Sequence, residues 1–275
     1  MRRNVLAQLS MVWTTDKGIV SVERPDISVA AISRSEVAEV AQRSAVDWFY
    51  LGSALILLAI VAVGFAPSFY FRYARILTGA TTPAYPTYLI LHGIVLTSWY
   101  LLYLAQTCLI ATKRIQVHRA VGLAGVVLAI LVFSVSMTVV LKAPARDLAA
   151  GASVAQISLM VIGDIAILLL FAALVTLGFL LRARKDTHKR LMTLASVSIV
   201  APAIARWPGA EATLPFSVVV PQLLFCAALA VHDMLTMRRV HPATIWGAAS
   251  YILVVGASVP LAFSDFGHRF VEALA

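Results

Sequence analysis

The feature that most constrains this chain is a succession of apolar stretches separated by short turns, three of which are basic and contain a histidine. These basic turns are Lys113–Arg119, Arg182–Arg190 and Arg238–His241. Each joins two hydrophobic runs, so the pattern predicts helical hairpins whose basic turns lie on one side of a membrane. The sequence is 61% hydrophobic and 13% charged, whereas a soluble domain is about 45–50% apolar and about 25% charged. We therefore expect a membrane protein.

Seven segments approach the roughly 20 residues that a helix needs to cross a bilayer. They are predicted at Trp48–Ala66, Tyr88–Ala111, Ala120–Leu141, Ile157–Leu181, Leu191–Ala205, Leu214–Leu235 and Ala243–Phe263. The predicted fold is thus an all-α, seven-helix integral membrane bundle. The fifth segment is short and contains Pro202, so we expect a kinked helix extended by His188 and Arg206. The alternative is a re-entrant segment, which leaves six spanning helices.

The distribution of Lys and Arg predicts the orientation. The net charge of +9 lies mainly in the basic turns and the N-terminal segment, and cytoplasmic loops carry an excess of positive residues. This places the basic turns and the N-terminus in the cytoplasm and the C-terminus outside, in a bacterial inner membrane. Because topology accounts for the charge, the expected partner is the lipid bilayer, and no nucleic-acid partner is expected.

The chain divides into three predicted regions. Residues 1–45 form a polar cytoplasmic tail, residues 46–264 the transmembrane helical domain, and residues 265–275 a short outer tail. Both cysteines, Cys108 and Cys226, lie inside apolar runs, where they behave as small hydrophobes and imply no disulfide.

Polar side chains in the outer half of the spans predict a ligand or proton site. Asp164 is an isolated carboxylate within the fourth segment, so it must pair with a cation, bind a proton or face water. Its expected partners by depth are His92 and Arg206. Helical periodicity aligns Trp99 and Gln106 with His92 on one face of the second segment. The predicted outer site therefore consists of His92, Trp99, Gln106, Asp164 and Arg206.

An inner cluster is predicted near the basic turns. Its members are His118, His188, His232, Asp233, Arg114 and Arg190. Haem b held between helices needs two neutral histidines at matching depth, and cations for its propionates. His118 and His188 each open a helix, whose positive end disfavours imidazolium. We therefore expect these two histidines as haem ligands in a membrane redox component.

The same hypothesis assigns the propionate partners to three cations, Arg114, Lys189 and Arg190. A redox protein of this kind would also need a membrane or cytoplasmic electron donor.

Three alternatives stay open, and the sequence does not decide whether the protein is an enzyme. A metal site could use His118, His188, His232 and Asp233, although no HExxH motif or i, i+4 histidine pair is present. The protein could instead bind anionic lipid or a small ligand without catalysis, since basic turns at helix N-termini hold phosphate groups. It could also be a small proton-coupled transporter that uses Asp164 in the outer cluster.

Part of the sequence resembles bacterial multi-pass predicted membrane proteins that are classed as a domain of unknown function. The similarity extends over about Tyr88 to Arg206 and rests on Leu91-His92-Gly93, Trp99, Gln106, Arg114, His118-Arg119, Gly122, His188-Lys189-Arg190-Leu191-Met192 and Arg206. This resemblance implies a helical bacterial membrane protein and supplies no activity. A weaker similarity to cytochrome b561-type bundles rests on histidines in several helices. The chain departs from their two-haem pattern because His92 is its only membrane-embedded outer histidine.

Overall fold

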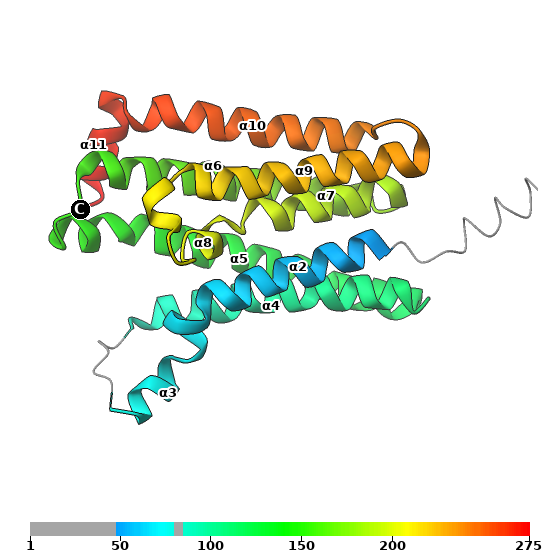
Figure 1. Cartoon of the computed structure of the whole chain (residues 1–275), viewed down its shortest axis with the longest axis horizontal. Coiled ribbons are helices and arrows are strands. Elements are labelled where there is room, and N and C mark those ends of the chain that lie inside the picture. The colour runs from blue at the N-terminus through cyan, green and yellow to red at the C-terminus, as the bar shows by residue number, and fades with distance from the viewer. Residues whose placement is uncertain (1–47, 80–84) are drawn as a thin grey trace, which may run out of the picture. The chain divides into compact units, whose positions relative to one another are not determined.

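The computed structural model describes residues 48–79 and 85–275, and the predicted N-terminal tail, residues 1–45, lies outside them. In the described ranges every regular element is a helix (Figure 1). The long helices are α2 (Trp48–Phe65), α4 (Thr87–Ala111), α5 (Ile115–Ala149), α6 (Val154–Leu180), α9 (Phe216–Met237) and α10 (Pro242–Ala262). The shorter elements are the π-helical turn η1 (Ala66–Tyr70), α3 (Arg72–Leu77), α7 (Lys185–Ser198), α8 (Ala201–Ile204), the 3-10 turn η2 (Ala210–Thr213) and α11 (Asp265–Ala273).

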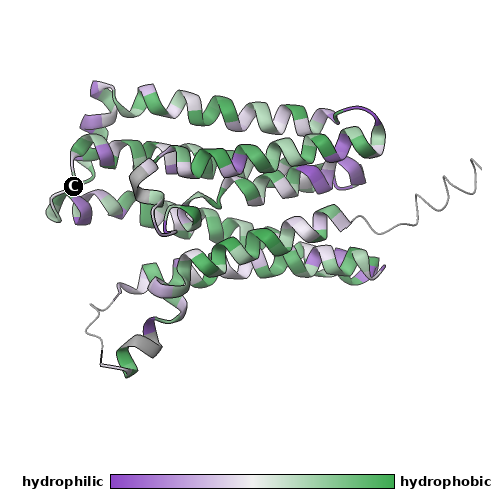
Figure 2. Ribbon diagram, viewed as in Figure 1, coloured by the Kyte–Doolittle hydropathy of each residue, from purple (hydrophilic) through white to green (hydrophobic). Residues whose placement is uncertain are grey.

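Among the described residues, six helices are long and apolar enough to cross a membrane: α2 with η1, α4, α5, α6, α9 and α10. Figure 2 shows apolar residues along these helices and hydrophilic residues gathered in several of the turns between them. The prediction of an all-α protein is confirmed, and six of its helices, rather than the seven predicted segments, have the length and composition of membrane spans. The predicted fifth segment differs from the other six, because it is divided between α7 and α8.

Pro202 explains why the fifth segment is broken. Proline has no backbone N–H and disfavours helical geometry in the residue before it. The carbonyl of Ser198 would receive its helical hydrogen bond from residue 202, so this carbonyl loses its backbone donor. Helix α7 ends at Ser198, and the N–H of Val200 turns instead to the Val197 carbonyl at 3.3 Å.

Side chains from α4 and α9 supply hydrogen bonds to the carbonyls at the break, and a side chain from α10 supports one of them. The Gln222 amide on α9 donates to the carbonyls of Val197 and Ser198, both at 2.9 Å. Tyr100 on α4 donates its hydroxyl to the Ser196 carbonyl at 2.9 Å. Tyr251 on α10 donates to Gln222 Oε1 at 2.6 Å and so orients the amide. The broken helix end is therefore satisfied without water, as an apolar environment requires.

Helix α7 lies at the centre of the bundle. It packs against α2, α6, α9 and α10, and its buried residues are Arg190, Leu191, Thr193, Leu194, Ala195, Ser196, Val197 and Ser198. Its serines and threonines favour this position, because their hydroxyls find partners inside protein but not in lipid. Thr193 and Ser196 each pair with an aromatic side chain of α4, since Tyr103 Oη lies 2.8 Å from Thr193 Oγ1 and Trp99 donates to Ser196 Oγ at 3.2 Å.

The three basic turns lie at the same end of the bundle (Figure 1). They connect α4 to α5, α6 to α7, and α9 to α10. At the opposite end, the predicted outer tail forms the short helix α11, which packs on α6 and α10. Gly267 permits this close approach, because a Cβ atom there would lie 2.5 Å from the Leu261 carbonyl oxygen and 2.6 Å from that of Ala262.

Two glycines of α2 provide a matched test of the packing between α2 and α8. A Cβ atom at position 64 would collide with the Ala203 carbonyl, whereas a Cβ atom at position 52 meets nothing within 4 Å. We expect Gly64→Ala to lower the free energy of unfolding by about 1–3 kcal/mol, because the two backbones must move apart. Thermal unfolding of the detergent-purified protein measures this loss, and Gly52→Ala should show none. Equal effects of the two substitutions would contradict the close packing.

Candidate functional site

The structure brings His118 and His188 together at the basic end of the bundle. His118 lies in the first turn of α5 and His188 in the first turn of α7. Their ring centroids are 6.3 Å apart and the ring planes are inclined by 80°. His188 Nδ1 lies 2.8 Å from the Gly178 carbonyl oxygen. A carbonyl oxygen only accepts, so Nδ1 of neutral His188 carries the proton and Nε2 keeps a free lone pair.

The side chain of Gln106 contacts His118 and so bears on which of its ring nitrogens carries the proton. It lies near the end of α4, where its side-chain amide reaches both the carbonyl and Nδ1 of His118. All of its contacts are satisfied when its nitrogen faces His118 and its oxygen accepts from Gly122 N–H at 3.1 Å. In that orientation Nδ1 of neutral His118 is an acceptor and Nε2 carries the proton. If the amide turns over, its oxygen can accept from Nδ1–H and leave Nε2 free, but the oxygen then also faces the His118 carbonyl and the amide nitrogen faces the Gly122 N–H.

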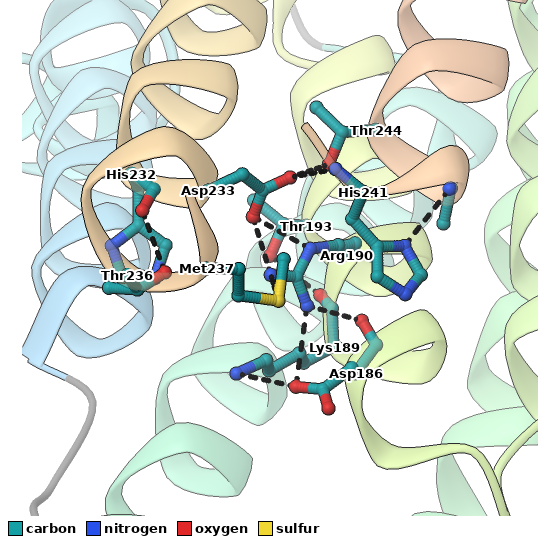
Figure 3. Close-up of polar contacts among 11 residues, drawn as sticks. Asp186, Lys189, Arg190, Thr193, His232, Asp233, Thr236, Met237, His241 and Thr244 are labelled. Carbon is teal, nitrogen blue, oxygen red and sulfur yellow. Dashed lines mark hydrogen bonds and ion pairs between the residues drawn. The ribbon is translucent and has the colours of Figure 1, made fainter. Parts of the chain in front are cut away.

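A buried ion pair joins α7 to α9 (Figure 3). Arg190 on α7 and Asp233 on α9 have side chains only 1% and 0% exposed. Asp233 Oδ1 accepts from Arg190 Nε at 2.9 Å and from Nη2 at 2.5 Å. Burial alone would lower the pKa of Arg190, but the hydrogen bond with Asp233 raises it above its ordinary value. The guanidinium therefore stays charged.

Further hydrogen bonds join this ion pair to the backbone of α7 and to the start of α10. Asp233 Oδ2 accepts from Thr244 Oγ1 at 2.6 Å and from the His241 backbone N–H at 3.0 Å. Arg190 Nη1 donates to the Asp186 carbonyl at 2.7 Å. Both carboxylate oxygens are thus occupied, and Asp233 joins α7, α9 and the start of α10. This arrangement indicates a structural role rather than a free ligand.

His232, another member of the predicted inner cluster, contacts helix α2. His232 stacks on Phe49 of α2, with ring centroids 4.4 Å apart and planes inclined by 10°. Within residues 48–79 and 85–275, no group of three or more His, Cys, Asp or Glu side chains is placed to hold a metal ion. The four-residue metal site considered from the sequence, His118, His188, His232 and Asp233, is therefore not assembled here.

The predicted outer site is also divided. Gln106 lies with His118, and Trp99 is buried against Phe171 with ring centroids 5.0 Å apart. His92 Nδ1 lies 3.3 Å from Ser136 Oγ, and Arg206 donates to the Pro202 carbonyl at 2.6 Å. Burial lowers the pKa of Arg206, and the negative charge of Asp164 partly opposes this shift. In the described part of the chain, no direct hydrogen bond joins His92, Asp164 and Arg206 to one another.

Several residues of the site were not expected from the sequence. Thr244 and the His241 backbone N–H complete the Asp233 site, and Gly178 orients His188. The proximity of Thr244 to a basic turn was the only available signal, because the contact depends on how α9 and α10 fold back on each other. Gly178 contributes only its backbone carbonyl, which every residue has, so the residue type could not have predicted the contact.

Comparisons of the chain with protein-family models, with curated proteins and with solved structures found no match. The site is therefore interpreted from its own geometry.

Removing one member of the buried ion pair should destabilise the protein strongly. We expect Asp233→Ala to lower the free energy of unfolding by about 3–5 kcal/mol, because Arg190 is left buried and charged without its partner. The exposed pair Arg146–Asp147, with Nε–Oδ1 at 2.6 Å, provides the control. Its disruption by Arg146→Ala should cost about 0–1 kcal/mol. Thermal unfolding in detergent measures both, and similar small losses would contradict a stabilising role for Asp233.

Proposed function

We propose that this multi-pass membrane protein is a redox component that binds haem b between α5 and α7, with His118 and His188 as the iron ligands. The observation that carries the proposal is the 6.3 Å separation of the two ring centroids. A bond between a metal and an imidazole nitrogen is about 2 Å long, so two imidazoles on one metal ion have ring centres at most about 6 Å apart. Bound haem would supply one-electron transfer.

The position of α5 relative to α7 supports this assignment. Helix α5 packs against α4 and α6, whereas α7 packs against α6 and three further helices. The histidines thus approach each other from helices that both adjoin α6. Metal-ligating histidines commonly donate the other ring N–H to a carbonyl, as His188 does to Gly178. For His118 to ligate through Nε2, the Gln106 amide must present its oxygen to Nδ1, and it then gives up its hydrogen bonds with the His118 carbonyl and the Gly122 N–H.

The contacts of the three candidate cations guide the proposal of propionate partners. Arg190 donates two hydrogen bonds to Asp233, so we do not propose it as a propionate partner. Arg114 is exposed at the start of α5, and Lys189 lies 3.1 Å from Asp186 with its side chain 32% exposed. These two residues remain the proposed cationic partners. An electron donor in the membrane or the cytoplasm would then approach the basic end.

We further propose that the basic end faces the cytoplasm of a bacterial cell and that the end carrying α11 faces outward. The excess of Lys and Arg in the three basic turns supports this orientation. Because these turns gather at one end of the bundle, a single orientation satisfies all three.

Visible absorption spectra test the haem assignment. Protein expressed with an ample haem supply and purified in mild detergent should show a Soret band and, after dithionite, a reduced α-band. We expect His118→Ala and His188→Ala each to abolish or shift these bands, because each removes one iron ligand. Gln106→Leu should leave haem bound but shift the spectrum, since Nδ1 of His118 loses its partner.

His268 on α11, at the opposite end of the bundle, provides the control, and His268→Gln should leave the spectrum unchanged. The absence of both bands from folded wild-type protein would refute the haem assignment, as would identical spectra for wild type, His118→Ala and His188→Ala.

A further inference from the structure

A groove opens at the basic end of the bundle, and neither Arg190 nor Asp233 lines it. The end of α6, the start of α7 and the start of α10 line this groove, whose volume is about 600 Å³. Two of the three basic turns contribute to it, so it lies where the apolar helices meet the polar turns. None of the proposed haem ligands lines it.

The polar lining of the groove is predominantly basic. It consists of Arg184, Lys185, Asp186, Thr187 and His241. The single carboxylate, Asp186, is paired with Lys189 at 3.1 Å and with Arg190 at 3.4 Å. Burial alone would raise the pKa of Asp186, but the hydrogen bond from Lys189 and the two positive charges lower it. Arg184 and Lys185 are exposed, so their positive charges are available to a ligand.

His241 adds a neutral hydrogen-bond donor. Its Nδ1 accepts from the Ala243 backbone N–H at 3.0 Å, so the proton of the neutral ring lies on Nε2. Burial lowers the pKa of His241, and the nearby charge of Arg190 lowers it further, although Asp233 and Asp186 oppose them. The ring is therefore neutral near pH 7 and can donate from Nε2.

The rest of the lining is mainly apolar. It includes Leu177, Leu181, Leu191 and Trp246. Trp246 is 72% exposed in the first turns of α10. Tryptophan at a helix end is typical of the membrane interface, where its ring lies at the level of the headgroups. A ligand that fills this groove therefore needs an anionic head and an apolar body.

We propose that the groove binds one anionic phospholipid, with its phosphate between Arg184, Lys185 and His241 and its acyl chains along Leu177, Leu181 and Trp246. A phosphate diester complements the basic rim, and the chains extend the apolar floor into the bilayer. No side chain caps the first turn of α7, so its backbone N–H groups can also donate hydrogen bonds to the phosphate.

Native mass spectrometry of the full chain tests the proposal with two lipids, dioleoylphosphatidylglycerol and dioleoylphosphatidylcholine. We expect wild-type protein to retain one phosphatidylglycerol in preference to phosphatidylcholine. The double substitution Arg184→Gln and Lys185→Gln should weaken this binding by roughly tenfold, because two cations near the headgroup are removed. Brominated phosphatidylglycerol should quench the tryptophan fluorescence of the protein, and the part of this quenching that comes from Trp246 should be lost in Trp246→Phe.

A charge-matched control distinguishes a defined site from a generally basic surface. Arg238 and Arg239 lie in the third basic turn, outside the groove lining, and their double substitution by Gln removes the same charge. This control should retain wild-type binding. Equal weakening in both double variants, equal retention of the two lipids, or full displacement of phosphatidylglycerol by millimolar sodium phosphate would each overturn the proposal. Haem spectra play no part in this test, so the two proposals succeed or fail separately.

Discussion

Backbone carbonyls at the break in the middle of the bundle accept hydrogen bonds from side chains of other helices, and the arrangement of α7 depends on those hydrogen bonds. Pro202 removes the helical donor of the Ser198 carbonyl, which accepts from Gln222, and Tyr100 and Gln222 also donate to the carbonyls of Ser196 and Val197. An unsatisfied carbonyl in an apolar environment costs several kcal/mol. The donors come from α4 and α9, so the break in α7 joins the helices around it.

Both candidate functional features depend on where α7 lies. His188 and Arg190 belong to its first turns, and they meet His118 of α5 and Asp233 of α9 respectively. The ion pair is costly to desolvate and is stabilised by additional hydrogen bonds from Thr244 and the His241 backbone. It anchors the basic end of α7, as Gln222 anchors the broken end. A helix held at both ends can present His188 in a defined position, which ligation of a cofactor requires.

Hydropathy and charge predicted the long helices and the common location of the basic turns, because both depend on local sequence. Pro202 likewise indicated the irregular fifth segment, but the sequence could not show that Gln222 would complete it. His232 and Asp233 were expected together, yet adjacent helical residues point about 100° apart, and they face α2 and α7 respectively. Gln106 was assigned to the stripe of His92, whereas the tight turn between α4 and α5 places it beside His118.

The thermal stability of Gln222→Leu, alone and combined with Pro202→Ala, tests the role of the break most directly. Gln222→Leu leaves the Ser198 carbonyl and the Tyr251 hydroxyl without their partners, and each unsatisfied buried group costs about 1–3 kcal/mol. Pro202→Ala restores an N–H that can reach Ser198, so the double variant should recover part of the lost stability. Wild-type stability in Gln222→Leu, or no recovery in the double variant, would contradict the account.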